Sequence, residues 1–237
     1  MKDNRYLQFQ ATLEKSSIGL AYVKGYDRLI SSIRDVADWD GFQAISAQIK
    51  TTSWFKDKGI LKEIEPELPH RSGYADTLLS FSQQDIYCEV SSLESFVKSI
   101  ELRKQGTDDK KIKLRLKEHP YLTKQEIEHE IKREKILRIL FKKTKEQLPE
   151  NYPSILALET GKAWVFHQEV KEIAERLFNS KLGNRPNIML IMHWSPERGS
   201  DIGEAPFWFI NHKSKYQNLG QELLKYLQVK PDCPHRG

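Results

Sequence analysis

The sequence lacks several features that mark common protein classes. It has two cysteines, Cys88 and Cys233, and no CxxC pair, so it predicts neither a disulfide framework nor a zinc ribbon. It has no glycine-rich phosphate-binding loop and no GxSxG motif, which argues against P-loop enzymes and serine hydrolases. No apolar run approaches the roughly 20 residues that cross a bilayer, and residues 1–5 lack a signal-peptide core. We therefore expect an intracellular, cytoplasmic protein with no membrane partner.

The chain does have enough length for one large domain, and its charge is uneven. Its 237 residues are 38% hydrophobic and 30% charged, which predicts a single folded domain over 1–237 with a modest core. The net charge is +5, yet residues 98–145 contain sixteen Lys and Arg against eight Asp and Glu. A charge run of this kind is most often a solvated helical face. Lysine and arginine are also the residues that bind the phosphates of nucleic acids.

Two predicted strands each carry a carboxylate. Residues 74–81 and 86–91 are rich in β-branched, aromatic and aliphatic side chains, and the polar residues 82–85 between them favour a hairpin loop. The strands should then be antiparallel and place Asp76 beside Glu89. Burial of carboxylates is costly unless something compensates it, and a divalent cation is one such compensator. The alternative is that one carboxylate faces solvent and the other has a salt-bridge partner.

Hydrophobic periodicity predicts most of the other elements. Residues 4–24 alternate weakly and favour a strand or short hairpin. Residues 27–55 have the spacing of an amphipathic helix, with a break near Asp38 that divides it in two. Thr123, followed three residues later by Glu126, is a capping box that begins a helix. The predicted ranges are strands at 59–68, 154–159, 187–194 and 207–210, and helices at 123–148, 165–179 and 216–228.

The order of these elements and the two acidic positions resemble the PD-(D/E)XK nuclease superfamily. Ala75-Asp76 resembles its first half-motif and Glu89-Val90-Ser91 its second, within residues 28–160. The resemblance implies an α/β (α+β) restriction-endonuclease-like core, with a central mixed sheet flanked by helices in the order α-β-β-β-α-β. To this core the chain adds a basic helical insertion at about 98–123 and a C-terminal extension at about 161–237 with further β-β-α elements.

The resemblance also implies a metal site. In this superfamily the strand Asp, the strand Glu and a backbone carbonyl bind Mg²⁺ or Mn²⁺, and these would be Asp76, Glu89 and the carbonyl of Val90. Such a metal polarises the scissile phosphate and lowers the pKa of a water that attacks it. The catalytic residues expected are Asp76, Glu89, the residue at the motif lysine position, Ser91, and Lys145 of the following helix.

Ser91 departs from the family pattern because it carries no positive charge. Some members of the superfamily supply the lysine from the following helix, and the candidates here are Lys135, Lys142 and Lys145, with Lys145 nearest the end of that helix. The alternative is a site that has lost its catalytic cation. A second departure is the acidic residue expected on the first helix, where Gln43 and Gln48 stand; Asp38 or Asp40 could take its place if the helix register permits.

These observations predict a metal-dependent nuclease that hydrolyses phosphodiester bonds in DNA. Lys135, Lys142, Lys145 and Arg71 are the expected nucleic-acid contacts, and a homodimer is one option for assembly. A catalytically inactive nuclease fold that binds nucleic acid or protein is the second hypothesis. A third hypothesis is a protein–protein module with an incidental acidic pair, in which the basic helix is a solvent face.

Overall fold

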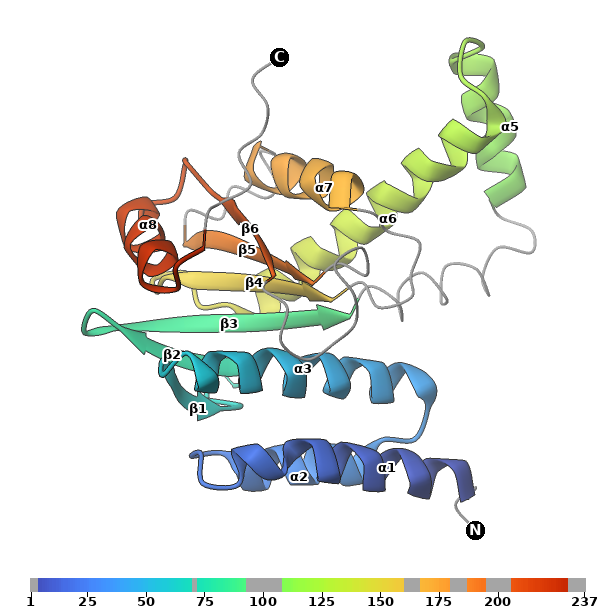
Figure 1. Cartoon of the computed structure of the whole chain (residues 1–237). Helices are drawn as coiled ribbons and strands as arrows, with labels where there is room; N and C mark the ends of the chain where they lie inside the picture. The colour runs from blue at the N-terminus through green and yellow to red at the C-terminus, as the bar shows by residue number, and fades with distance from the viewer. Residues whose placement is uncertain are drawn as a thin grey trace.

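The chain folds around a six-stranded mixed sheet with helices on both faces (Figure 1). The computed structural model describes residues 4–69, 72–92, 108–159, 167–179, 187–194 and 206–229. The strands are β1 (Leu61–Ile64), β2 (Thr77–Phe81), β3 (Gln84–Ser92), β4 (Ser154–Glu159), β5 (Ile188–Trp194) and β6 (Phe207–Ile210). None of the helices in these ranges is both long and apolar enough to span a membrane.

The strands lie in the sheet in the same order as in the chain. β1, β2 and β3 are antiparallel, β3, β4 and β5 are parallel, and β6 returns antiparallel to β5. The parallel strands are buried on both faces, which explains why β4 and β5 read as nearly continuous apolar runs. The expected mixed sheet flanked by helices is therefore present.

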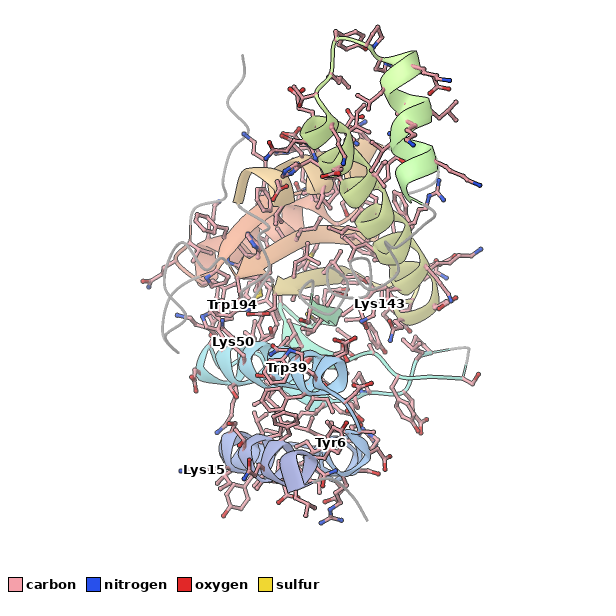
Figure 2. The ribbon with its side chains drawn as sticks, turned by 90° about the vertical axis from the view of Figure 1, so that its right-hand side faces the viewer. Tyr6, Lys15, Trp39, Lys50, Lys143 and Trp194 are labelled. Carbon is pink, nitrogen blue, oxygen red and sulfur yellow. The ribbon has the colours of Figure 1, made fainter. Side chains whose placement is uncertain are left out.

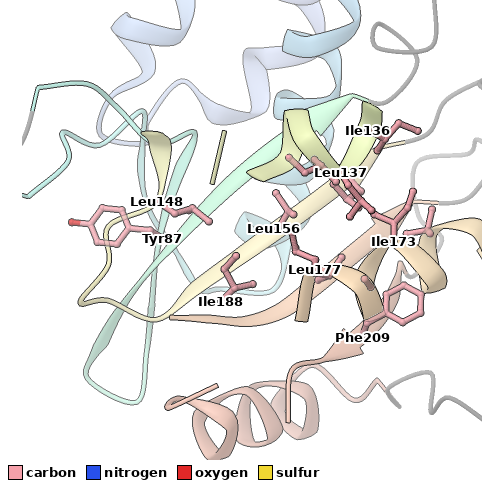
Figure 3. Close-up of a cluster of buried hydrophobic side chains, with 14 of the residues drawn as sticks. Tyr87, Ile136, Leu137, Leu148, Leu156, Ile173, Leu177, Ile188 and Phe209 are labelled. Atoms are coloured by element: carbon pink, nitrogen blue, oxygen red, sulfur yellow. The ribbon is translucent and has the colours of Figure 1, made fainter. Parts of the chain in front are cut away.

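α6 (Lys124–Gln147) and α7 (His167–Asn179) cover one face of the sheet. Figure 3 shows the apolar cluster between these helices and the strands. Its members from the sheet include Leu78, Tyr87, Leu156 and Ile191, and its members from the helices include Leu137, Leu140, Ile173 and Leu177. We call this side the α6 face.

α3 (Trp39–Asp57) and α8 (Gln217–Tyr226) cover the opposite face. Their apolar cluster takes in the alternate residues of the strands, among them Leu79, Cys88, Val90, Ile155 and Leu190. α3 is covered in turn by α1 (Asn4–Ser17) and α2 (Tyr26–Asp35), with a short 3₁₀ turn (Ile18–Leu20) between them. α3 is thus apolar on two sides.

The prediction of a strand or hairpin over residues 4–24 was wrong. This segment forms α1 and the 3₁₀ turn, and Leu13 and Leu20 pack into a cluster with Leu29 and Ile33 of α2. Few side chains of α1 are buried, so its apolar spacing is weak, and contact with other helices decides its conformation.

Several other boundaries follow the predictions closely. The helix predicted at 27–55 is divided, and Asp38 caps α3 by accepting a hydrogen bond from the Gly41 amide at 2.7 Å. The capping box at the start of α6 is confirmed: Thr123 and Glu126 bond reciprocally. The predicted strand 59–68 shortens to β1, and the strand predicted to begin at Tyr74 begins at Thr77. α5 (Asp108–Glu118) lies within the predicted basic insertion.

The α6-face cluster makes the first testable prediction. Leu156 lies on the central strand β4 with no exposed surface, so Leu156→Ala removes buried methyl groups and leaves a cavity. We expect the free energy of unfolding, measured by urea denaturation, to fall by about 2–5 kcal/mol. The matched control is Leu7→Ala, because Leu7 is half exposed on α1 and should change stability by less than about 0.5 kcal/mol. Equal losses in the two variants would contradict this account of the core.

Candidate metal and phosphate site

The β2–β3 hairpin sets the geometry of the acidic pair. Its turn consists of Ser82 and Gln83, both with positive φ (49° and 61°), as in the two-residue turns that match the twist of paired strands. The register that follows pairs Thr77 with Cys88. Continued by one residue, this register places Asp76, just before β2, opposite Glu89. Residues directly opposite on antiparallel strands point to the same face of the sheet.

That face is the one covered by α6. Leu78 and Tyr87 contribute to the α6-face cluster, and Asp76 and Glu89 are each two residues away from one of them. At this point α6 presents Lys143, whose Nζ donates to Glu89 Oε1 at 2.9 Å and to the Val90 carbonyl oxygen at 3.1 Å. Figure 2 labels Lys143 near the end of α6. A lysine from the following helix therefore reaches the acidic pair.

The backbone of Val90 is part of the same site. β2 begins at Thr77, so Val90 lies beyond the stretch of β3 that β2 pairs with. The amide of Val90 donates to Asp76 Oδ2 at 2.7 Å, and its carbonyl oxygen accepts from Lys143. The side chains of Asp76 and Lys143 thus form the hydrogen bonds to the Val90 amide and carbonyl groups that a longer β2 would otherwise form.

Burial sets the electrostatics of the pair. It raises the pKa of Glu89 well above its usual value; the charge of Asp76 adds to this rise, and the ammonium of Lys143 opposes it. Burial also raises the pKa of Asp76, against the charge of Lys143 and the amide of Val90. For Lys143, burial lowers the pKa but the charges of Glu89 and Asp76 outweigh it, so the net shift is upward. The pKa shift of Lys143 therefore favours its charged form, whereas the pKa shifts of Asp76 and Glu89 favour their protonated forms.

The oxygen atoms present fit a hard divalent cation. Glu89 has no exposed surface, and its Oε2 accepts no hydrogen bond from a donor in the described ranges. With Asp76 and the Val90 carbonyl it provides the oxygen ligands that Mg²⁺ prefers, and Mg²⁺ often binds through one or two carboxylates while it keeps several waters. No group of three or more His, Cys, Asp or Glu side chains among the described residues is placed to hold a metal.

Ser91 points to the same face as Glu89 and is fully buried. Its Oγ has no hydrogen-bond partner among the residues that the structure describes. Because a strand alternates its side chains, position 91 is where a motif lysine would reach the pair. In this structure an ammonium group reaches Glu89 from Lys143 on α6.

The predicted helix lysines lie elsewhere on α6. Lys145 is two residues beyond Lys143, so it leaves the helix about 200° away, and Lys142 leaves it about 100° away. Both side chains are exposed. Lys143 was not among the sequence candidates, because choosing among neighbouring lysines needs the rotation of α6 against the sheet. The side chain of Lys135, and all of Arg71, lie outside the described residues.

Gln48 of α3 lies beside the acidic pair together with Glu65, a carboxylate that sequence analysis missed. Gln48 Nε2 donates to Glu65 Oε1 at 3.3 Å and to the Asp76 carbonyl oxygen at 3.4 Å. Ser32 also donates to Glu65 Oε1, at 3.1 Å. Burial raises the pKa of Glu65; Ser32 and Gln48 oppose this rise, and the charge of Asp76 adds to it. Asp38 does not substitute, because it caps α3 ten residues before Gln48.

Glu65 also has an unusual backbone. Its φ of 46° is in the left-handed region, which is uncommon for a residue other than glycine. Its amide donates to the Asp76 carbonyl oxygen at 3.0 Å, which holds Glu65 beside the site. Only its position before Pro66 could have marked it in the sequence.

No protein-family model, curated protein or solved structure matches this chain.

The raised pKa of Glu89 predicts a pH dependence of stability in the absence of metal. An unfolded glutamate has a pKa of about 4.3. Because the folded pKa is higher, the stability contributed by Glu89 is fully present below the unfolded pKa and is lost as the pH rises through the folded pKa. Gln carries no charge at any pH. The unfolding free energy of Glu89→Gln minus that of the wild type should therefore rise as the pH is raised above about 4.3, by up to about 1.4 kcal/mol per pH unit.

This difference is measured by urea denaturation in EDTA. Asp85→Asn is the control, because Asp85 lies on the same hairpin but is more than a third exposed and paired with Lys62. Its difference from the wild type should stay flat over the same range. A flat or falling difference for Glu89→Gln would show that the buried carboxylate does not hold an extra proton.

Proposed function

We propose that this protein is a metal-dependent nuclease that hydrolyses phosphodiester bonds in DNA. One observation carries the proposal: the ammonium of Lys143 lies against Glu89 and Val90, opposite Asp76, although the strand itself has Ser91. The carboxylates of Asp76 and Glu89, the carbonyl group of Val90 and the ammonium of Lys143 therefore lie in one site. The architecture around them supports the resemblance to PD-(D/E)XK nucleases.

Asp76, Glu89 and the carbonyl of Val90 would hold Mg²⁺ or Mn²⁺. When bound, the metal supplies Lewis-acid polarisation of the phosphate and a more acidic water. Asp76 is oriented by the Val90 amide, so its Oδ2 is fixed before any ligand arrives. Such preorganisation lets a site stabilise developing charge without rearranging during the reaction.

Lys143 would have two roles. Without a divalent cation, it compensates the carboxylates by bonding to Glu89 and Val90. These oxygens belong to the proposed ligand set, so in the loaded site Lys143 would instead stabilise the charge of the phosphate or orient the water. A flexible four-carbon stem permits both roles.

The phosphate backbone would approach along the same helix. Lys142 and Lys145 are exposed on α6 on either side of Lys143, and Arg138 is exposed one turn earlier. These three residues are the proposed phosphate contacts on α6, and Lys135 and Arg71 stay predicted contacts, because the side chain of Lys135 and the whole of Arg71 lie outside the described residues. Contacts of this kind supply affinity without sequence specificity.

A second candidate function is a catalytically inactive nuclease fold that binds nucleic acid or protein. The observation that favours it is the same ammonium, because Lys143 bonds to Glu89 Oε1 and to the Val90 carbonyl oxygen, two of the oxygens in the proposed ligand set. A permanent ion pair would leave no vacancy for a cation. Cleavage assays distinguish the two functions.

The first test replaces Lys143. Lys143→Met keeps most of the aliphatic stem and removes the charge, so plasmid cleavage in Mg²⁺ or Mn²⁺ should slow by about 100- to 1000-fold, the cost of removing one charge-stabilising donor. DNA affinity, measured in Ca²⁺, should change little. Lys142→Met and Lys145→Met are the matched controls and should keep most of the cleavage rate, while Asp76→Asn should abolish it.

Two results would contradict the proposal. Wild-type protein that cleaves neither plasmid nor single-stranded DNA with either metal would favour the inactive fold. Cleavage by Lys143→Met at the wild-type rate would remove Lys143 from the chemistry. A melting-temperature check of each variant separates loss of activity from loss of folding.

A second test addresses the phosphate contacts. Reversing Lys142 and Lys145 to Glu should reduce the slope of log affinity against log salt by about 0.9 for each lost contact. Fluorescence anisotropy with a labelled duplex in EDTA measures this slope. Lys58→Glu with Lys225→Glu is the control, because both lysines are exposed but lie after α3 and on α8. The same change in both double variants would indicate a general charge effect.

A further inference from the structure

α5 and the start of α6 form a helical hairpin, residues 108–131, that projects away from the sheet (Figure 1). The hairpin has a small apolar core of its own, made by Ile112, Ile127 and Ile131 with Leu116 and Leu122. Arg115 ties the two helices together, because its Nη2 lies 2.8 and 2.9 Å from the two carboxylate oxygens of Glu134. These contacts fix which side of α5 faces outward. We call residues 108–131 the arm.

The outward side of α5 is a row of lysines. Lys110, Lys113 and Lys117 recur at three and four residues, so they share one face of the helix, and all three are exposed. Leu114 lies between them and is 57% exposed. Within the described part of the chain, no carboxylate forms an ion pair with these lysines, whereas Arg115 on the inner side pairs with Glu134. Residues 108–131 carry equal numbers of basic and acidic residues, so the positive charge is local: it is the row of three exposed lysines on the outward side of α5.

The distance between the arm and the candidate site is set by α6, because this helix begins in the arm and contains Lys143 near its end. Arg115 is held to Glu134, nine residues before Lys143 on α6. At a rise of 1.5 Å per residue, the α5 lysines lie on the order of 15–25 Å from Lys143 along α6. Figure 2 looks at the side where Lys143 is labelled, and α5 stands at the top of that same side. A ligand that lies across this side can meet both.

We propose that the α5 lysines are a second nucleic-acid contact, which grips a DNA duplex about 4–7 base pairs away from the Asp76–Glu89 site. The inference rests on the proposed nuclease function and specifies its substrate as extended duplex. A duplex rises 3.4 Å per base pair, so this span matches the distance along α6. Its persistence length of about 150 base pairs keeps it straight over such a span, so one rigid ligand reaches both contacts without an ordering cost. A flexible single strand lacks this advantage.

The test is a comparison of duplex lengths. Binding of 6-, 12- and 20-base-pair duplexes is measured by anisotropy in EDTA, so no cleavage is needed. The arm variant is Lys110, Lys113 and Lys117→Glu; Lys→Gln at the same positions removes the charge without adding like-charge repulsion to α5. Against the 20-base-pair duplex, the salt slope should fall by about 0.9 per contact, up to about 2.7, in the Gln variant. Against the 6-base-pair duplex, arm variants and wild type should agree within about twofold.

The control is a triple variant of exposed lysines away from the arm, Lys15, Lys58 and Lys225→Glu, with the same change in net charge. It should show no length-dependent loss. The arm proposal is overturned if the arm variants bind the 20-base-pair duplex like wild type, if their loss is equal at every length, or if the loss appears with a single-stranded 20-mer instead. Absence of wild-type binding to any DNA at low salt would overturn the proposed function as well.

Discussion

The fold around the candidate site depends on one buried interaction, the hydrogen bonds from Lys143 to Glu89 and to the Val90 carbonyl oxygen. Two carboxylates that face each other in a sheet are costly to bury, because burial disfavours their charged forms and each disfavours the charge of the other. Lys143 offsets part of this cost, and the Val90 amide fixes Asp76. Without an ammonium here, the carboxyl groups would have to stay protonated or gain a cation from solution.

Three separate packing constraints bring this interaction about. The tight turn at Ser82 and Gln83 sets the register that places Asp76 opposite Glu89. The late start of β2, at Thr77, leaves the backbone of Val90 available to side chains. The apolar cluster on the α6 face sets the rotation of α6 about its own axis. This rotation determines which lysine of α6 points toward Glu89 on the sheet. The site thus couples a local hairpin to a helix more than fifty residues away.

Sequence reasoning succeeded where a signal is local and failed where it is not. β4 and β6 were predicted to the residue, because buried apolar runs between polar loops are local patterns, and the capping box marked the start of α6. α1 was missed because few of its side chains are buried. Lys143 was missed because its neighbours have the same chemistry and only tertiary packing separates them. Glu65 was missed because no sequence motif marks it. A hydrogen bond from its backbone amide to the Asp76 carbonyl oxygen holds it beside the site.

The most direct test of the central claim is a crystal structure of the protein soaked in Mn²⁺, with anomalous differences collected near the manganese edge. The account predicts one anomalous peak bound by carboxylate oxygens of both Asp76 and Glu89. Lys143 should then have moved off the Val90 carbonyl oxygen, from which its Nζ lies 3.1 Å in the structure described above. Absence of a peak at millimolar Mn²⁺, with Lys143 still bonded to Glu89 and Val90, would contradict the claim that these residues form a metal site.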